Sequence, residues 1–237
     1  MTMENSKLSF KGGNPGAVQY GNFINYYQFH PPENRLKLLP TDLWPNNKPF
    51  HVLDLGCNAG DLTIELYNFL KGKVQNCEIL GVDIDPTLVE RANEKNQNKE
   101  NIQFRCLDFM SDKSLIKDYL KKRKLAKFDA VFCFSITMWI HLNYGDDGLI
   151  RFLNEICDLG DFVIIEPQPW KCYRSAVKRL KLSDATFPLF KELQITHDVE
   201  NKIEQHILTS CKAVKLYESE RSEWGRKLQI FKCPPVN

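Results

Sequence analysis

From Phe50 onward, apolar runs alternate with amphipathic stretches, and this alternation restricts the possible folds more than any other feature of the chain. Strands that are buried on both faces give continuous apolar runs, and helices between successive strands make those strands parallel, with right-handed crossovers. The pattern therefore predicts an α/β fold with a doubly wound, mostly parallel sheet. The expected strands are residues 50–55, 78–84, 102–108, 128–136 and 161–167, and the expected helices are residues 61–70, 86–96, 114–125, 146–157 and 170–180.

The C-terminal part of the chain has a different pattern. Residues 211–219 and 226–233 are two strand-like runs separated only by a short turn, so we expect them to pair antiparallel. Five strand–helix units closed by an antiparallel hairpin form the Rossmann-like layout of class I S-adenosylmethionine (SAM) methyltransferases. The 237 residues suit one such domain at 20–237, preceded by a flexible N-terminus at 1–19.

The composition argues against several other classes of protein. No apolar run approaches about 18 residues and the polar start has no signal-peptide core, so we expect a cytoplasmic protein that does not span a membrane. The eight cysteines include no C-x-x-C pair and no histidine at ligand spacing, which favours reduced thiols and no metal. The net charge of +2 is too small to indicate nucleic-acid binding by itself, so any such binding must rest on local basic patches.

The turn after the first expected strand, "LDLGCNAG" at 53–60, contains the first ligand signal. Ligands of doubly wound sheets bind outside the carboxyl ends of the strands, where this turn lies. Gly56 and Gly60 are present, but Asn58 takes the middle glycine position of a dinucleotide-binding turn, which argues against a pyrophosphate. A cofactor without phosphates fits better, with Gly56 facing the amino-acid part of SAM and Asp54 holding either the loop or the ammonium group. The alternative is a tight turn that binds no ligand.

Two more strand ends carry ligand signals. Asp83 ends the second expected strand, 27 residues after Gly56, where an acid can accept hydrogen bonds from both ribose hydroxyls. Its alternative role is to cap the next helix, although Asp85 is better placed to do so. Asp108 and Phe109 end the third strand, where the acid can bind the adenine amino group and the ring can cover the base. The agreement of three strand ends favours a SAM site.

Longer motifs point to a particular family. They are "YGNFINYYQFHPPENRLKLLP", "DLGCNAGDL", "CFSITMWIHLNYGDDGL" and "IIEPQPWKCYR". From about Tyr20 to the C-terminus, the chain resembles the bicoid-interacting-protein-3 family of RNA 5′-phosphate methyltransferases. The branch of that family that caps a small nuclear RNA on its γ-phosphate has an arginine and a lysine where this chain has His30 and Met138. The chain resembles instead the branch that methylates the 5′-monophosphate of histidine transfer RNA and of some microRNA precursors.

The resemblance implies roles for individual residues, with the segment 20–40 acting as a lid over the site. The cofactor would be held by Arg35 at its carboxylate, by Gly56, Cys57 and Asn58 at its methionine part, by Asp83 and Ile84 at the ribose, by Asp108 and Phe109 at the adenine, and by Phe134. The bidentate pairing with a carboxylate suits the planar guanidinium of Arg35. In the lid, Asn22, Tyr26 and His30 would serve catalysis, and Tyr20 and Tyr27 would contact the RNA end.

Residues near the ends of the fourth and fifth expected strands are candidates for binding the RNA acceptor. His141 would donate a hydrogen bond to the phosphate, or it would have a structural role instead. Trp170 would stack on the terminal base or merely anchor the following helix. Lys171, Arg174 and Lys178 recur at helical spacing on that helix, which indicates an RNA-binding face. The basic run at 121–124 lies on a helix further round the sheet, where a solvated face is the favoured interpretation.

The predicted function is SAM-dependent methylation of the 5′-monophosphate of small RNAs by a monomer without a metal, with S-adenosylhomocysteine as the product. A monophosphate ester is already mostly dianionic at pH 7, because its second pKa is about 6, so the nucleophile needs no general base. His30 and Met138 would leave this oxygen nucleophilic, because neither adds a fixed positive charge. The alternatives are a γ-phosphate capping enzyme, a small-molecule O-methyltransferase with an apolar acceptor pocket, and a non-catalytic RNA-binding scaffold. The scaffold would be expected to have lost Arg35, Asp83 or Asp108.

Overall fold

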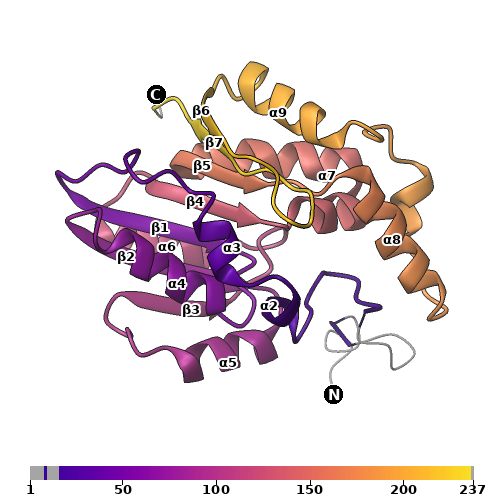
Figure 1. The fold of residues 1–237 in the computed structure, drawn as a ribbon, viewed down its shortest axis with the longest axis horizontal. Coiled ribbons are helices and arrows are strands. Elements are labelled where there is room, and N and C mark those ends of the chain that lie inside the picture. The colour runs from indigo at the N-terminus through magenta and orange to yellow at the C-terminus, as the bar shows by residue number, and fades with distance from the viewer. Residues whose placement is uncertain (1–7, 10–15, 236–237) are drawn as a thin grey trace.

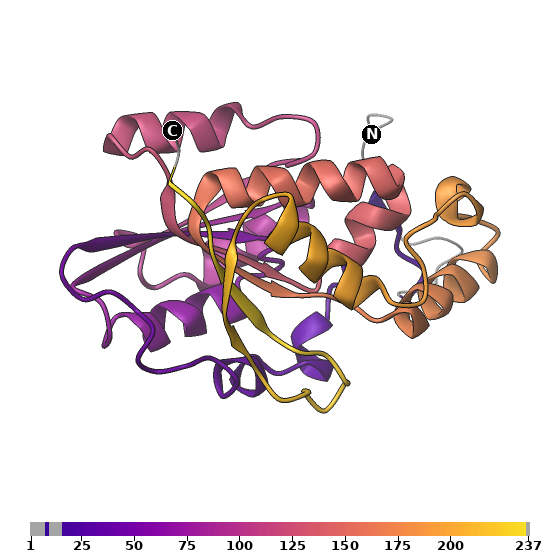
Figure 2. The same ribbon diagram turned by 90° about the horizontal axis from the view of Figure 1, so that it is seen from above.

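The computed structural model describes residues 8–9 and 16–235, which form a seven-stranded sheet with helices on both faces (Figures 1 and 2). The strands are β1 (Pro49–Leu55), β2 (Asn76–Asp83), β3 (Ile102–Cys106), β4 (Phe128–Phe134), β5 (Gly160–Glu166), β6 (Val214–Glu218) and β7 (Gln229–Lys232). The helices are α2 (Tyr26–Phe29), α3 (Pro32–Leu36), α4 (Asp61–Leu70), α5 (Pro86–Lys95), α6 (Ser114–Arg123), α7 (Thr137–Leu159), α8 (Trp170–Lys181), the short 3₁₀ helix η2 (Pro188–Lys191) and α9 (Val199–Thr209).

The sheet order is β3-β2-β1-β4-β5-β7-β6. Strands β1 to β5 pair in parallel, whereas β7 pairs antiparallel with both β5 and β6. The predicted doubly wound sheet with an antiparallel C-terminal hairpin is therefore confirmed. The hairpin turns so that β7, whose Ile230 and Phe231 are fully buried, joins the parallel strands and β6 forms the edge. The strand order reverses between β1 and β4, which is where ligands bind in such sheets.

The period-two pattern of the strands divides the core between the two faces of the sheet. In β4, Val131 and Cys133 pack with residues of α6, α7 and α9, and Ala130 and Phe132 pack with residues of α4 and α5. Each fully buried aliphatic side chain contributes roughly 1.5–3 kcal/mol relative to exposure. These two cores hold the strand ends in register, and a pocket lies at those ends.

Helix α7 begins earlier than its sequence predicts. The expected helix started at residue 146, but the structure is helical from Thr137, with a break at Gly145, whose φ and ψ are 71° and −172°. Residues 135–144 are apolar and aromatic enough to resemble a continued strand, and "YGDDG" resembles a helix start. The first part of α7 therefore folds back over the end of β4 and lines the pocket with Trp139.

Two further parts of the fold differ from the expected layout. Helix α9 was not predicted, although its buried Val199, Ile203 and Ile207 recur every four residues, as in an amphipathic helix. At the other end of the chain, Ala17 and Val18 are buried in the core that packs against α6, α7 and α9, which we call the main core. Packing therefore begins before residue 20, where we expected the domain to start. Most of the remaining expected flexible segment, 1–7 and 10–15, lies outside the described residues.

Candidate active site

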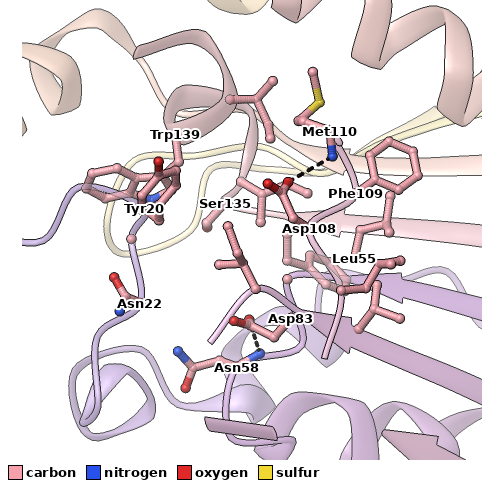
Figure 3. Close-up of a pocket in the computed structure, with 18 of the residues that line it drawn as sticks. Tyr20, Asn22, Leu55, Asn58, Asp83, Asp108, Phe109, Met110, Ser135 and Trp139 are labelled. Atoms are coloured by element: carbon pink, nitrogen blue, oxygen red, sulfur yellow. Dashed lines mark hydrogen bonds between the residues drawn. The ribbon is translucent and has the colours of Figure 1, made fainter. Parts of the chain in front are cut away.

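A pocket of about 930 Å³, including its open mouth, lies at the carboxyl ends of β1 to β4 (Figure 3). Side chains converge on it from the strand ends and from the N-terminal segment. Of the residues predicted from the sequence, it is lined by Tyr20, Asn22, Tyr26, Tyr27, Arg35, Gly56, Asn58, Asp83, Ile84, Asp108, Phe109 and Phe134.

The turn after β1 brings its backbone close to the pocket. Gly56 has a φ of 78°, and a Cβ there would lie 2.4 Å from Cγ2 of Ile136, so only glycine fits. The N–H of Gly56 donates to the carbonyl of Val82 at 2.9 Å, which ties the turn to β2. The side-chain amide of Asn58 donates to the carbonyl of Phe23 at 3.0 Å. The turn therefore connects β1, β2 and the N-terminal segment around one cavity.

Asp83 at the end of β2 is oriented by two backbone N–H groups. Asn58 donates to Oδ2 at 2.8 Å (Figure 3), and Asp85 donates to Oδ1 at 3.0 Å. A carboxylate has about four lone-pair positions, so acceptor capacity remains for ligand hydroxyls. Burial raises the pKa of Asp83 to about 6, although the backbone hydrogen bonds oppose this shift. Helix capping is done by Asp85, which accepts a hydrogen bond from the N–H of Thr87 at 2.9 Å, so Asp83 is available to a ligand.

The chain after β3 supplies an acid and an aromatic ring to the same pocket. Oδ1 of Asp108 accepts a hydrogen bond from the N–H of Met110 at 3.0 Å (Figure 3), which fixes the carboxylate. Phe109 is buried and packs edge-to-face on Phe152, with their centroids 5.6 Å apart. An acceptor beside an apolar wall suits a planar base that carries an amino group.

Arg35 of α3 is fully buried at the pocket wall and pairs with Glu166 at the end of β5. Its Nε and Nη2 donate to the Glu166 carboxylate at distances of 2.9–3.2 Å, and Nη2 also donates to Oη of Tyr26 at 2.6 Å. Burial lowers the pKa of Arg35, but the charge of Glu166 raises it overall, so the guanidinium is charged. The predicted bidentate contact with a cofactor carboxylate needs correction, because Glu166 occupies this fork. Only Nη1, buried and without a partner among the described residues, remains for a ligand.

Two residues from the loop between β6 and β7 complete this cluster, and the sequence did not predict them. Nε1 of Trp224 donates to Glu166 at 3.0 Å, and Nη1 of Arg226 lies 3.6 Å from the same carboxylate. Burial raises the pKa of Glu166, but the charges of Arg35 and Arg226 lower it overall. The sequence does contain one indication of this cluster, because Glu166, like Asp83, is an acid that ends a buried strand.

Asp54, Cys57 and His141 do not line the pocket, which decides the open choices for Asp54 and His141 and corrects the expected contact of Cys57. Asp54 accepts a hydrogen bond from Oγ1 of Thr63 at 2.6 Å, so it holds the loop against α4. The Cys57 side chain packs into the core with residues of α4 and α5. The buried ring of His141 contacts Oη of Tyr173 at 3.1 Å through Nδ1 and Asp146 at 2.7 Å through Nε2. Both ring nitrogens serve the fold, so His141 is not available as a phosphate donor.

His30 and Met138, proposed together as the basis of phosphate preference, lie in different surroundings. The His30 ring stacks on Tyr26, with centroids 4.6 Å apart, and burial, with the nearby charges of Arg226 and Arg35, lowers its pKa to about 4. His30 is therefore uncharged at neutral pH. Met138 is 3% exposed and belongs to the main core, so its side chain cannot act on an acceptor phosphate.

Helix α8 presents basic side chains to solvent. Lys171, Arg174 and Lys178 are exposed, whereas Tyr173 on the opposite side of the helix is fully buried. Trp170 stacks on Phe190 at 5.4 Å with an interplanar angle of 13°, which supports its alternative role as an anchor. The helix lies at the same end of the molecule as the N-terminal segment (Figure 1), and Nε of Arg179 donates to the carbonyl of Gly16 at 3.1 Å.

The described part of the chain contains neither a candidate metal cluster nor a candidate membrane span. Over residues 8–9 and 16–235, no group of three or more histidine, cysteine or acidic side chains is arranged to hold a metal ion. In the same part of the chain, no helix combines the length and the apolar character needed to cross a membrane.

The sheet order, the glycine turn after β1 and the acids that follow β2 and β3 define the class of the protein, which is a class I SAM-dependent methyltransferase. A general methyltransferase-domain model matches residues 52–159, and the model of the family described as "Bicoid-interacting protein 3 (Bin3)" matches residues 128–233. The chain belongs to the Bin3 family, in the branch of the RNA 5′-monophosphate methyltransferases, because two relatives with this name or its close equivalent match most of its length. The pre-miRNA 5′-monophosphate methyltransferase of Xenopus laevis is 43% identical to this chain, and the match covers 92% of this chain and 93% of the Xenopus protein. The RNA 5′-monophosphate methyltransferase of Homo sapiens is 42% identical, and the match covers 92% of this chain and 82% of the human protein.

Solved structures agree with the fold. The N-methyltransferase NodS from Bradyrhizobium japonicum aligns with a TM-score of 0.56 and 13% identity, over 89% of this chain and 98% of its own. Another structure of that protein was solved in complex with S-adenosyl-L-homocysteine, and aligns with a TM-score of 0.51 and 11% identity over 78% of this chain and 79% of its own. At such identities the likeness concerns the fold alone.

Proposed function

We propose that this chain transfers a methyl group from SAM to the 5′-monophosphate of a small RNA, such as a histidine transfer RNA or a microRNA precursor. The observation that carries the proposal is the match, over 92% of the chain, to relatives named for this activity. Aromatic and basic side chains near the expected acceptor end, Tyr26 in the pocket and the exposed Lys171 on α8, also support it, because a small-molecule O-methyltransferase would need a bulky apolar acceptor pocket. The scaffold alternative has no support, because Arg35, Asp83 and Asp108 are all present in the pocket.

The residues of the pocket fit SAM. The buried Nη1 of Arg35 has no partner among the described residues and suits a carboxylate. Asp83 has acceptor capacity for ribose hydroxyls, and Asp108 and Phe109 suit the adenine. Asn22 donates its amide hydrogens to the carbonyl of Leu8 and to Asp85, and its buried Oδ1 is left as an acceptor that suits an ammonium group. When bound, SAM supplies an electrophilic methyl group on a sulfonium.

The protein's task toward the acceptor is to position a phosphate that is already nucleophilic. The phosphate dianion needs no general base, and alignment of the reacting atoms supplies the main rate gain. Tyr26 is suited to this task, because its Oη accepts hydrogen bonds from Arg35 at 2.6 Å and from Arg226 at 3.5 Å. Its own O–H is therefore directed away from the two guanidinium groups and can donate to a phosphate oxygen.

The test of the proposed function uses the full chain, methyl-labelled SAM and a small RNA with a 5′-monophosphate. We expect label to enter the RNA, and we expect prior phosphatase treatment of the RNA to abolish incorporation. Equal incorporation before and after phosphatase treatment would overturn the 5′-phosphate assignment.

Replacement of Asp83 by alanine is expected to weaken binding of SAM or S-adenosylhomocysteine by about 1–3 kcal/mol. The ribose hydroxyls would lose a charged acceptor in a site that excludes much of the solvent. Isothermal calorimetry with S-adenosylhomocysteine measures the effect. Asp118→Ala removes an equally negative side chain from the exposed face of α6 and serves as the control. Unchanged affinity of the Asp83 variant would contradict the proposed orientation of the cofactor.

Replacement of His30 by arginine is expected to lower turnover on 5′-monophosphate RNA by about tenfold. A third cation beside Arg35 and Arg226 would draw charge from the attacking oxygen and displace the ring that now stacks on Tyr26. Paired assays on 5′-monophosphate and 5′-triphosphate forms of one RNA measure it, and we expect the native chain to prefer the monophosphate. The exposed change His197→Arg is the control. If the His30 variant keeps the native preference for 5′-monophosphate over 5′-triphosphate RNA, His30 does not determine that preference.

A further inference from the structure

The loop between β6 and β7, residues 219–228, places a second guanidinium next to the pocket. Arg226 is only 9% exposed, and its Nη1 donates to Oγ of Ser135 at 2.5 Å and to Oη of Tyr26 at 3.5 Å. Both acceptors line the pocket. Arg226 therefore lies immediately behind the side chains that form the pocket wall, although it is far from Ser135 and Tyr26 in the sequence.

The buried charges at this wall do not balance. Two guanidinium groups, those of Arg35 and Arg226, face one carboxylate, that of Glu166, at distances of 2.9 and 3.6 Å. His30, packed between Tyr26 and Trp224, is uncharged at neutral pH. The cluster thus carries an excess positive charge, and a buried charge without a counter-ion is costly.

The hydrogen bonds of Arg226 are also incomplete. Its Nε is buried and has no acceptor among the described residues. A buried donor without an acceptor costs about 1–3 kcal/mol, so such groups are usually satisfied by a ligand or by water. Nε and the neighbouring nitrogens form a planar fork, which matches two oxygens of a phosphate. An anionic ligand at this position would satisfy both the donor and the excess charge.

The loop that carries Arg226 contacts each element expected to meet the RNA end. Trp224 packs against His30 of the N-terminal segment, and Asn34 donates to Glu223 at 3.3 Å. Gly225 has a φ of 78°, and a Cβ there would lie 3.2 Å from Nζ of Lys171 on α8. The loop therefore lies between the lid and the basic helix, where a strand running along α8 would bring its 5′ end.

We propose that Arg226 binds the 5′-phosphate of the RNA and is the residue by which the enzyme selects a phosphorylated end. This inference rests on the proposed function, since it names the group that recognises the acceptor. Nη1 of Arg35 remains for the carboxylate of the cofactor. Arg226 lies across Ser135 and Tyr26 from the cofactor pocket, and there it would bind the phosphate of the RNA.

The test compares the native chain with Arg226→Gln and Arg226→Lys, each saturated with S-adenosylhomocysteine. The measured quantity is the ratio of the dissociation constants of one RNA with a 5′-hydroxyl and with a 5′-monophosphate. We expect the native chain to prefer the phosphate about tenfold or more. Arg226→Gln should nearly abolish this preference for the phosphate, and it should raise KM for the RNA much more than it lowers kcat. Arg226→Lys should retain part of the preference, because lysine keeps the positive charge but lacks the planar pair of donors. Affinity for S-adenosylhomocysteine should stay near the native value, and Arg105→Gln, an exposed change on β3, should change nothing.

The outcomes separate the two proposals. Native methylation that is insensitive to phosphatase sinks the proposed function itself. Phosphatase-sensitive native methylation, together with a full phosphate preference in Arg226→Gln, overturns only the role of Arg226. If thermal unfolding finds Arg226→Gln unfolded, Arg226→Lys decides alone, and a native preference in that variant overturns the bidentate contact.

Discussion

Replacement of Arg35 by methionine is expected to destabilise the fold by about 3 kcal/mol, toward the lower end of the range of about 3–5 kcal/mol for breaking a buried ion pair. The side chain is fully buried, and its removal leaves the buried Glu166 carboxylate without its nearest counter-ion. Arg226, at 3.6 Å, still compensates part of that charge, which is why we expect the lower end. Affinity for S-adenosylhomocysteine should fall about tenfold or more, because the donor assigned to its carboxylate is lost. Urea denaturation and calorimetry measure the two effects.

The double variant Arg35→Met with Glu166→Gln tests whether Glu166 keeps a useful partner when Arg35 is lost. It keeps an amide acceptor for the N–H of Trp224, which now donates to Glu166 at 3.0 Å, but it leaves the buried Arg226 without its carboxylate partner. We therefore expect the double variant to be no more stable than Arg35→Met, and to have an equally low affinity for S-adenosylhomocysteine. A single variant that keeps native stability and native affinity would show that Arg35 has neither role.

The parts of the site that the sequence predicted are those fixed by local rules. Asp83 and Asp108 follow buried strands of a parallel sheet, and the carboxyl ends of such strands meet at one edge. Gly56 was predictable for the same reason, because a tight turn from strand to helix at that edge requires positive φ. The positions of these residues could be predicted from the alternation of strands and helices alone, and the apolar runs of the sequence indicate that alternation clearly.

The parts that the sequence did not predict depend on packing between distant segments. Arg226 lies behind the pocket wall because β7 inserts beside β5 and turns its loop over the strand ends, and no local pattern encodes that insertion. The inward direction of His141 depends on where α7 starts and on its break at Gly145. The motif match suggested that His141 and Cys57 face ligands, but α7 and the core packed against α4 and α5 turn these side chains toward the protein interior.

Neutralising Lys171, Arg174 and Lys178 together, each to glutamine, is expected to weaken RNA binding by up to roughly 100-fold at moderate salt. These side chains are exposed along one face of α8, which begins directly after the end of β5, and Lys171 lies beside the loop that carries Arg226. Each lost phosphate contact should reduce the slope of log affinity against log salt by about 0.7–0.9, so the slope should flatten by up to roughly 2–3. Electrophoretic mobility shift or anisotropy titrations at several salt concentrations measure both quantities.

The matched control neutralises Lys121, Lys122 and Lys124, which removes the same number of charges from exposed positions on and after α6. Helix α6 lies apart from α8 in both views of the molecule (Figures 1 and 2), so this change should leave RNA affinity and its salt slope almost unaltered. Because the α8 side chains do not line the cofactor pocket, affinity for S-adenosylhomocysteine should be native in both triple variants. If both variants weaken RNA binding equally, the protein attracts RNA through its overall charge and α8 is only a solvated face. If only the α8 variant does so, the RNA approaches along α8, and its 5′ end arrives where Tyr26 and Arg226 can hold the phosphate.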